Sequence, residues 1–313
     1  MAKVSIDIEA PWEVWDESAH VGVLHRGEKS KEKVLVRLEQ CSVARADSTL
    51  RAERKFLVGL KHPAALRLIS LSHLPGDDAA LAWVYEGFWG VSLRFLFQSQ
   101  KGLNKNLPLK AALDVVTQVA QLMEAVEEAK PQGGRVMTLV GPTPSDILIN
   151  GQGELRVAGV KSVARGVQRV SPLGYAAPEG SSEKSCGYQM GALLVDLLTG
   201  EPPGAGAEDP ARHEATVRRA TIRVLARSGT TVPDELMELI RQCLAHDVTS
   251  RPDWATIVER CAAILGGLGG EGLVDWATAV VPGLVEVPEE YAPVESSEDV
   301  PESSEDAPES SED

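Results

Sequence analysis

The sequence lacks the features that mark several large classes of protein. No run of apolar residues approaches the length of about 18 that spans a membrane, so we expect no membrane insertion. The first 13 residues mix charged and apolar side chains, which argues against a signal peptide. The 4 cysteines show neither CxxC nor Cys/His metal spacing, and they are Cys41, Cys186, Cys243 and Cys261. Thiols scattered in this way are typical of a reducing compartment, so we expect a cytoplasmic protein without a metal site.

Positive charge is absent from the end of the chain. No lysine or arginine follows Arg260, whereas 14 acids lie between Glu271 and Asp313. The formal net charge of −15 is therefore concentrated there, because the residues up to Arg260 hold 31 bases and 32 acids. This acidity argues against a nucleic-acid partner, since nucleic-acid phosphates would repel it.

Composition divides the acidic end into three segments. Residues 266–272 are rich in glycine and predict a flexible linker. Residues 273–290 include a short apolar stretch that can dock on the same chain or on a partner, and we favour the same chain. Residues 291–313 repeat proline, glutamate and serine, a composition that cannot bury a core and predicts a disordered tail. This acidic tail either only solvates the chain, or engages a basic partner, or is phosphorylated at its serines.

Hydrophobic periodicity predicts an α+β fold with strands first and helices later. Apolar residues recur at helical spacing from Pro108 to Ala129 and again from Pro233 to Leu244. Short β-like runs precede these helices along the chain. A chain of 313 residues is long enough to bury the core of a two-lobed domain and to carry an appendage.

The order of short motifs along the chain carries a more specific prediction. The motifs are Glu53 with Leu60–Pro63, an apolar run ending at Glu86, Pro144–Asn150, Ala177-Pro178-Glu179, the apolar run Tyr188–Pro203, and Arg251-Pro252. Their order and spacing over residues 18–265 resemble those of the protein kinase-like superfamily. The residues that make up these motifs resemble those of bacterial serine/threonine protein kinases more than those of animal ones.

This resemblance implies the two-lobed protein kinase-like fold. We expect an N-terminal extension at residues 1–17, a small β-rich lobe with its C helix at 18–87, and a larger α-helical lobe at 88–265. In the family, an ion pair equivalent to Glu179 with Arg251 ties the activation segment to the final helices.

The groups that a kinase uses to transfer phosphate are replaced at the positions that the resemblance assigns to them. Arg37 stands for the third-strand lysine, Gly141 for the catalytic aspartate, and Thr143 for the lysine two positions later. Gly159 stands for the metal-binding aspartate of Asp-Phe-Gly, and its spacing from Gly141 is that of a kinase. Residues 21–27 align with the glycine-rich loop but hold only 2 glycines, wrongly spaced. We therefore expect no phosphoryl transfer.

Weak candidates for nucleotide contacts remain in the expected cleft, and they are Arg37, Glu53, Glu86 and Asp146. Arg37 and Glu53 either pair or are ordinary exposed charges. Asp146, at the position of the second metal ligand, is either a magnesium ligand or a turn residue, and we favour the turn. One carboxylate alone makes a poor magnesium site, so we expect neither a bound metal nor a bound cofactor.

Three further positions differ from the family pattern or bear on the cleft. Cys186 replaces an aspartate that braces the catalytic loop in the family. Tyr85 would fill the back of the cleft. Four of the 6 tryptophans fall where a kinase core does not require one, and they are Trp12, Trp15, Trp89 and Trp276. Such residues are enriched at binding surfaces, but for each of them we favour packing.

The sequence therefore predicts a pseudokinase that acts as a protein-binding scaffold or allosteric regulator in a signalling pathway. Its partner would be an active kinase or another regulator of that pathway. Two alternatives stay open. The first is nucleotide binding without turnover. The second is an atypical active kinase in which Asp146 works with a displaced acid such as Asp47 or Asp196.

Overall fold

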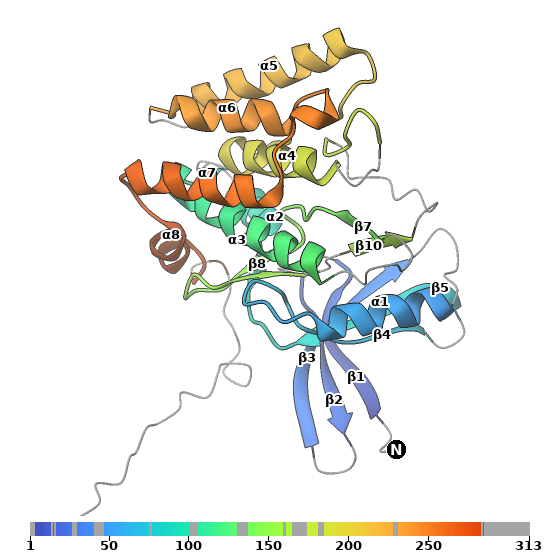
Figure 1. Ribbon diagram of the computed structural model, residues 1–313. Coiled ribbons are helices and arrows are strands. Elements are labelled where there is room, and N and C mark those ends of the chain that lie inside the picture. The colour runs from blue at the N-terminus through green and yellow to red at the C-terminus, as the bar shows by residue number, and fades with distance from the viewer. Residues whose placement is uncertain are drawn as a thin grey trace, which may run out of the picture.

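The structure is a computed structural model with a strand-rich lobe and a helical lobe (Figure 1). It describes residues 4–13, 15, 17–26, 30–40, 47–74, 77–99, 106–129, 137–158, 161–164, 174–180, 185–227, 231–282 and 284. The two lobes and their order along the chain are those of the expected kinase-like fold.

The small lobe is built on one antiparallel sheet. Its strands are β1 (Val4–Pro11), β2 (Ala19–Arg26), β3 (Ser30–Gln40), β4 (Leu68–Leu74) and β5 (Asp77–Glu86), in the spatial order β1-β2-β3-β5-β4. The central strands bury side chains on both faces, because successive residues of a strand point to opposite sides. Leu35 faces the main core, whereas Val34 and Val36 face a smaller apolar cluster with Leu24 and Val84. Helix α1 (Asp47–Gly59) packs against β4.

Strand β1 changes the expected boundary of the small lobe. It pairs with β2 from Val4 opposite Arg26 to Pro11 opposite His20, so it is the edge strand of the sheet and not an extension that precedes residue 18. The glycine-rich loop was expected at residues 21–27, but residues 21–26 belong to strand β2. The error arose because the true β1–β2 loop, residues 12–18, contains no glycine by which to recognise it.

Short strands join the two lobes. The strands β6 (Val91–Ser92), β8 (Ile147–Ile149) and β9 (Leu155–Val157) form a small sheet beneath α2 (Leu93–Ser99). A bridge between Ala65 and Val157 ties this sheet to the segment that leads into β4. A second pair of strands, β7 (Met137–Val140) and β10 (Lys161–Ala164), flanks the loop that contains Gly141.

The helical lobe is organised around one buried helix. Its helices are α3 (Leu109–Glu128), α4 (Ser185–Thr199), α5 (Pro210–Arg227), α6 (Asp234–Cys243), α7 (Trp254–Gly267) and α8 (Leu273–Val280), with a 3₁₀ turn at Val248–Ser250. Every residue of α4 is buried, and the helix contacts α3, α5 and α6. Gly191 permits the close approach of α6, because a Cβ at Gly191 would lie 2.7 Å from the Cβ of Cys243.

The apolar stretch after α7 docks on the same chain. Helix α7 continues through Gly266 and Gly267, so the glycine-rich connection is shorter than expected. Helix α8 then packs on α3 through buried Leu273 and Trp276, and the amide of Leu273 donates to Asp114 Oδ2 at 2.9 Å. The acidic tail, residues 291–313, lies outside the described residues. Among the residues that are described, no helix has the length and apolar character to span a membrane.

A buried ion pair ties the segment ending at Glu179 to the last helices. The side chain of Arg251 is fully buried, and its Nη1 and Nη2 donate to the two oxygens of Glu179 at 2.7 and 2.8 Å. Arg251 Nε donates to the carbonyl of Ala245, and the guanidinium lies over the ring of Tyr188. The ion pair that the sequence predicted is therefore present, with two parallel hydrogen bonds and one backbone partner.

The Glu179–Arg251 pair yields a prediction for stability. Glu179→Gln leaves the buried Arg251 without its counter-charge, so we expect the free energy of unfolding to fall by about 3 kcal/mol. Chemical denaturation followed by circular dichroism measures this loss. The matched control is Glu238→Gln, because Glu238 forms an exposed pair with Arg241 and its loss should leave the midpoint nearly unchanged. Equal effects of the two variants would contradict the prediction.

Burial of the thiols gives a second prediction. Burial raises the pKa of Cys243 to about 12 and that of Cys261 to about 11. Both thiols therefore stay protonated at pH 8, and the thiolate is the reactive form. With Cys41 replaced by serine, we expect Ellman's reagent to leave the folded chain unlabelled at pH 8 and to label it fully in guanidinium chloride. Rapid labelling of Cys243 in the folded chain would refute this expectation.

Candidate functional site

The candidate site lies at the junction of the two lobes, where a kinase-like fold would hold its nucleotide. Arg37 enters it from β3, and Tyr85 and Glu86 come from the end of β5. Asp146 enters from the other side, on the turn just before β8. Residues from distant parts of the sequence thus meet here, as the resemblance implied.

Arg37 and Asp146 form an ion pair across this junction. Arg37 Nη1 donates to Asp146 Oδ1 at 3.1 Å, and the two side chains are only 17% and 11% exposed. The second carboxylate oxygen, Oδ2, accepts hydrogen bonds from the amide and the hydroxyl of Thr143 at 3.1 and 2.9 Å. Asp146 therefore closes a turn and holds an arginine. The side chain of Glu53 is not described, so its pairing with Arg37 stays a prediction.

The loop between β1 and β2 enters the same junction. We call residues 12–18 the tryptophan loop. Trp15 is 1% exposed, and its indole Nε1 donates to the carbonyl of Ser145 at 3.1 Å. The Trp15 carbonyl in turn accepts from the hydroxyl of Ser92 at 2.8 Å. The Trp15 ring meets Tyr85 edge-on, and the Arg37 guanidinium lies 5.5 Å from the ring centroid. Trp15 thus contacts both lobes at the point where the ion pair crosses.

Trp12 anchors the other end of the tryptophan loop. Its Nε1 donates to the carbonyl of Gly90 at 3.1 Å, and its ring meets Trp89 edge-on with centroids 5.6 Å apart. The amide of Trp15 donates to the carbonyl of Trp12, which folds the loop into a tight turn. A phosphate-binding loop offers amide groups and glycines that allow close approach, whereas this loop presents two buried indoles.

Gly141 is fixed by a residue that the sequence did not single out. Its amide donates to the side-chain oxygen of Gln189 on α4, and Gln189 is 3% exposed. A Cβ at Gly141 would lie 2.9 Å from that same oxygen. Gln189 therefore braces this loop, whose bracing aspartate in the family is replaced by Cys186. The signal was an amide side chain in the buried helix α4, because a buried polar group requires a partner.

Asp196 is also part of a buried polar cluster. Its side chain is fully buried, and Oδ2 accepts from Arg94 Nη2 at 2.7 Å and from the Tyr175 hydroxyl at 2.5 Å. Burial and then the Asp196 charge raise the pKa of Tyr175 well above its usual range. Asp196 therefore holds the segment around Tyr175 against α4 and α2. The role of displaced acid that the atypical-kinase alternative gave to Asp47 or Asp196 stays a prediction, and the side chain of Asp47 is not described.

The remaining site candidates divide between paired and undescribed residues. Glu86 pairs with Arg67, whose Nε lies 2.9 Å from Glu86 Oε2 and whose amide donates to Oε1 at 3.2 Å. Gly159 lies outside the described residues. Within the described part of the chain, no three His, Cys, Asp or Glu side chains gather as a metal site would require.

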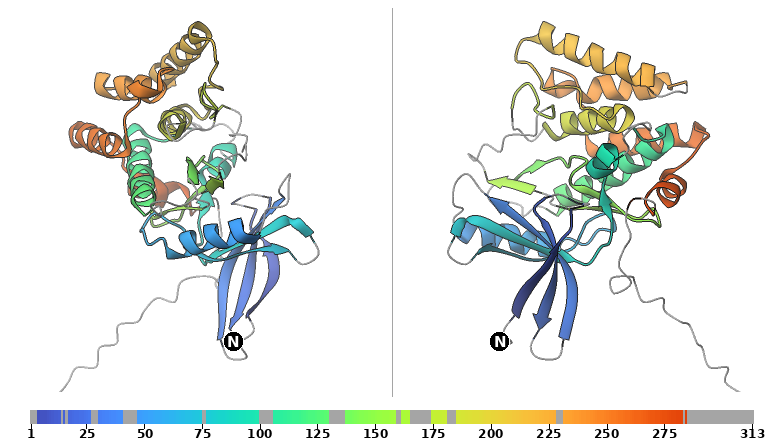
Figure 2. Two further views of the ribbon diagram at one scale, coloured as in Figure 1. Left: turned by 45° about the vertical axis from the view of Figure 1, so that its right-hand side comes forward. Right: turned by 180° about the vertical axis from the view of Figure 1, so that it is seen from behind.

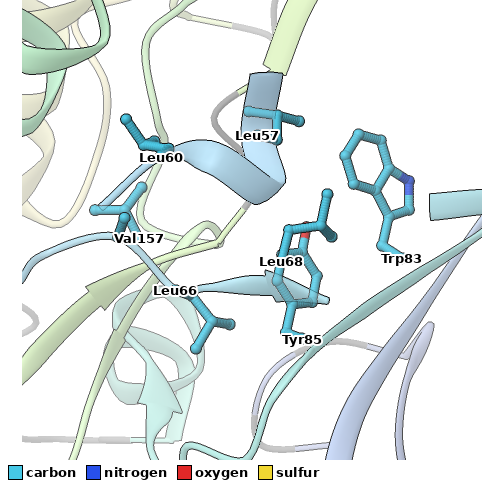
Figure 3. Close-up of a pocket in the computed structure, with 8 residues that line it drawn as sticks. Leu57, Leu60, Leu66, Leu68, Trp83, Tyr85 and Val157 are labelled. Carbon is cyan, nitrogen blue, oxygen red and sulfur yellow. The ribbon is translucent and has the colours of Figure 1, made fainter. Parts of the chain in front are cut away.

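An apolar cavity lies behind Tyr85, between α1 and the sheet. Its lining includes leucines from the end of α1 and the start of β4, together with Trp83 and Tyr85 of β5 (Figure 3). The cavity measures about 20 Å³, which is the space of about one water molecule. Tyr85, which is 2% exposed, fills the back of the junction as the sequence predicted.

Comparisons with known proteins agree with this architecture. No family model matches the chain. The chain is 27% identical over 239 residues to the serine/threonine-protein kinase PkaB of Streptomyces coelicolor, and 26% identical over 241 residues to PkaA of the same organism. Its structure resembles the PknI kinase domain of Mycobacterium tuberculosis with a TM-score of 0.58 and 14% identity, over 83% of this chain and 95% of that domain.

These similarities have a defined extent. The matches cover 71% and 72% of this chain but only 54% and 41% of PkaB and PkaA, so the chain spans about half the length of these relatives or less. The likeness to PknI adds the fold of a kinase domain. Motif order, sequence similarity to two serine/threonine kinases and the two-lobed fold all support the protein kinase-like superfamily for this chain.

Proposed function

We propose that this protein is a pseudokinase: a protein-binding scaffold or allosteric regulator in a signalling pathway that transfers no phosphate. The observation that carries the proposal is the occupation of the lobe junction by the protein's own side chains. Trp15 lies against Arg37 and Tyr85, and Arg37 is paired with Asp146. The space in which a kinase holds ATP is thus filled by two residues and an ion pair of the chain itself.

The chemistry of the site supports the absence of phosphoryl transfer. The reaction depends on a base that orients the attacking hydroxyl and on carboxylates that hold magnesium at the phosphates. Gly141 has no side chain to accept a proton, and the space beside it is taken by Gln189. Asp146 already accepts from Arg37 and Thr143, so binding a metal would require breaking those contacts.

The energy of opening the junction also opposes nucleotide binding. An aromatic side chain buries roughly 150–250 Å², and each Å² of apolar area contributes about 25 cal/mol. Exposing Trp15 alone would therefore cost about 4 kcal/mol, which lowers an apparent affinity about 1,000-fold. ATP would have to supply that free energy before any contact of its own contributed. We therefore propose that the resting protein carries neither nucleotide nor metal.

The partner of such a module is a protein. Relatives of the chain are named serine/threonine kinases, so an active kinase or a regulator of the same cytoplasmic pathway is the partner we propose. Two alternatives remain, and each has a distinct signature. A nucleotide-binding pseudokinase would bind ATP without turnover, whereas an atypical active kinase would need magnesium and would move phosphate.

Thermal unfolding with ATP tests the proposal directly. With millimolar ATP, with or without magnesium, we expect no change in the unfolding midpoint, because the site is filled. A ligand at about 100 times its dissociation constant would stabilise the chain by roughly 2.7 kcal/mol, a shift of several degrees. An active serine/threonine kinase measured in parallel serves as the control. A magnesium-dependent shift would overturn the proposal, and phosphate transfer with an Asp146→Ala comparison would then identify an active kinase.

Removal of the indole at the junction provides a further prediction. Trp15→Ala should lower the free energy of unfolding by about 3 kcal/mol, because it deletes a buried aromatic side chain. We also expect ATP to shift the midpoint of this variant, since the barrier to entry is gone, while phosphate transfer stays absent because Gly141 supplies no base.

The control for this variant is Trp276→Ala, which removes a buried indole from α8 instead. It should lose stability without gaining a response to ATP. Phosphate transfer by Trp15→Ala would show that the site retains a catalytic base and would refute the pseudokinase proposal.

A further inference from the structure

The outer face of α5 presents apolar and basic side chains to solvent. Helix α5 lies at the end of the helical lobe that is farthest from the sheet (Figure 1, Figure 2). Ile222 and Leu225 are 55% and 56% exposed, and they account for two of the five large hydrophobic residues that are exposed within the described part of the chain. Arg218 and Arg219 are exposed beside them at helical spacing. We call these four residues the α5 face.

The positive charge of α5 is only partly neutralised. The helix carries Arg212, Arg218, Arg219, Arg223 and Arg227 against one acid, Glu214. Arg223 and Arg227 turn toward Glu201, with nitrogen to oxygen distances of 3.6 and 3.3 Å. Arg219 donates to the hydroxyl of Thr216. Within the described residues, no carboxylate lies within ion-pair distance of Arg212, Arg218 or Arg219. The α5 face therefore keeps two arginine charges without an acidic partner there.

We propose that the α5 face docks the acidic tail of this same chain, residues 291–313. The first argument is charge. These residues include 9 acids and no base, while α5 has the excess of arginine described above. In a chain whose first 260 residues are close to neutral, the two segments are the most strongly opposed in charge that we find.

The second argument is the chemistry of the repeat. Each copy in the tail has an alanine or valine and a proline before an acidic Glu-Ser-Ser-Glu-Asp stretch, as in Val300–Asp306 and Ala307–Asp313. Such a unit offers a small apolar group and several carboxylates side by side. The α5 face offers the complement, because Ile222 lies about one turn and Leu225 about two turns along the helix from Arg218 and Arg219. The tail contains three such units in succession, and each of them can occupy the α5 face.

The third argument is reach. The described chain ends at residue 284, which leaves 29 residues to follow. An extended chain covers about 3.3 Å per residue, so these residues span up to about 95 Å. A compact domain of this size has a radius of gyration of about 19 Å, so every part of its surface is within reach. Tethering also gives the tail an effective concentration in the millimolar range, at which weak contacts suffice.

Cleavage of the tail by a Glu-specific protease tests the proposal on the full chain. Mass spectrometry of the intact protein gives the rate of tail loss. In 20 mM salt we expect Arg218→Gln/Arg219→Gln to lose the tail at least fivefold faster than the native chain. The matched control is Arg51→Gln/Arg54→Gln on α1, which removes the same charge from another exposed helix and should leave the rate unchanged. Salt at 0.5 M should erase the difference, since it screens exposed charges.

Further variants separate docking from other effects. Arg218→Lys/Arg219→Lys should keep the native cleavage rate, because the charge is retained, and Ile222→Ser/Leu225→Ser should raise it, because the apolar contact is lost. Circular dichroism melts identify any variant that fails to fold, and the comparison then rests on the other pair. Equal rates in the native chain and in both α5 variants would overturn the proposal.

Two other occupants of the α5 face give different results. If the tail of a second copy docks there, protection rises with protein concentration, and docking within one chain is refuted. If the face binds an anionic membrane instead, vesicles containing phosphatidylserine retain the native chain but not Arg218→Gln/Arg219→Gln, while tail cleavage is the same in both. That outcome also overturns the proposal.

Discussion

The packing of one indole between the two lobes determines how the rest of this protein is organised. Trp15 is almost fully buried, and it touches residues from β3, β5 and the turn before β8. Its Nε1 and its carbonyl are both hydrogen-bonded to the helical-lobe side of the junction. Because buried aromatic area is a large source of stability, an open junction would be costly. The lobes are held together where an enzyme of this architecture needs them to part.

Three arginine–carboxylate contacts continue this arrangement through the molecule. Arg37 with Asp146 crosses the lobes, Arg94 with Asp196 anchors the segment around Tyr175, and Arg251 with Glu179 ties that segment to the last helices. The carboxylates of Asp146 and Asp196 are largely buried, and each of the two accepts from a hydroxyl as well as from its arginine. Removing one partner of a buried ion pair lowers the free energy of unfolding strongly, because the other charge is left buried without a counter-charge. The polar groups near the junction therefore maintain the fold.

The two ends of the chain modify the kinase-like scaffold in different ways. At the start, β1 and the tryptophan loop join the small lobe and fill the junction. Toward the end, α8 packs on α3. The helical lobe between them leaves the basic, apolar face of α5 uncovered within the described residues.

The sequence by itself determined the kinase-like two-lobed fold, helices α3 and α6, and the Glu179–Arg251 pair, because motif order and hydrophobic periodicity are local and additive signals. It misplaced the start of the small lobe and the glycine-rich loop. The loop at residues 12–18 has no glycine, and strand β1 before it is an edge strand that pairs only with β2. Only the tertiary structure decided that Trp12 and Trp15 enter the junction, that Arg37 takes Asp146, and that Gln189 braces Gly141. Those contacts join residues far apart in the chain, such as Arg37 and Asp146, 109 positions apart. No local pattern encodes which of several compatible partners a side chain meets once the lobes close.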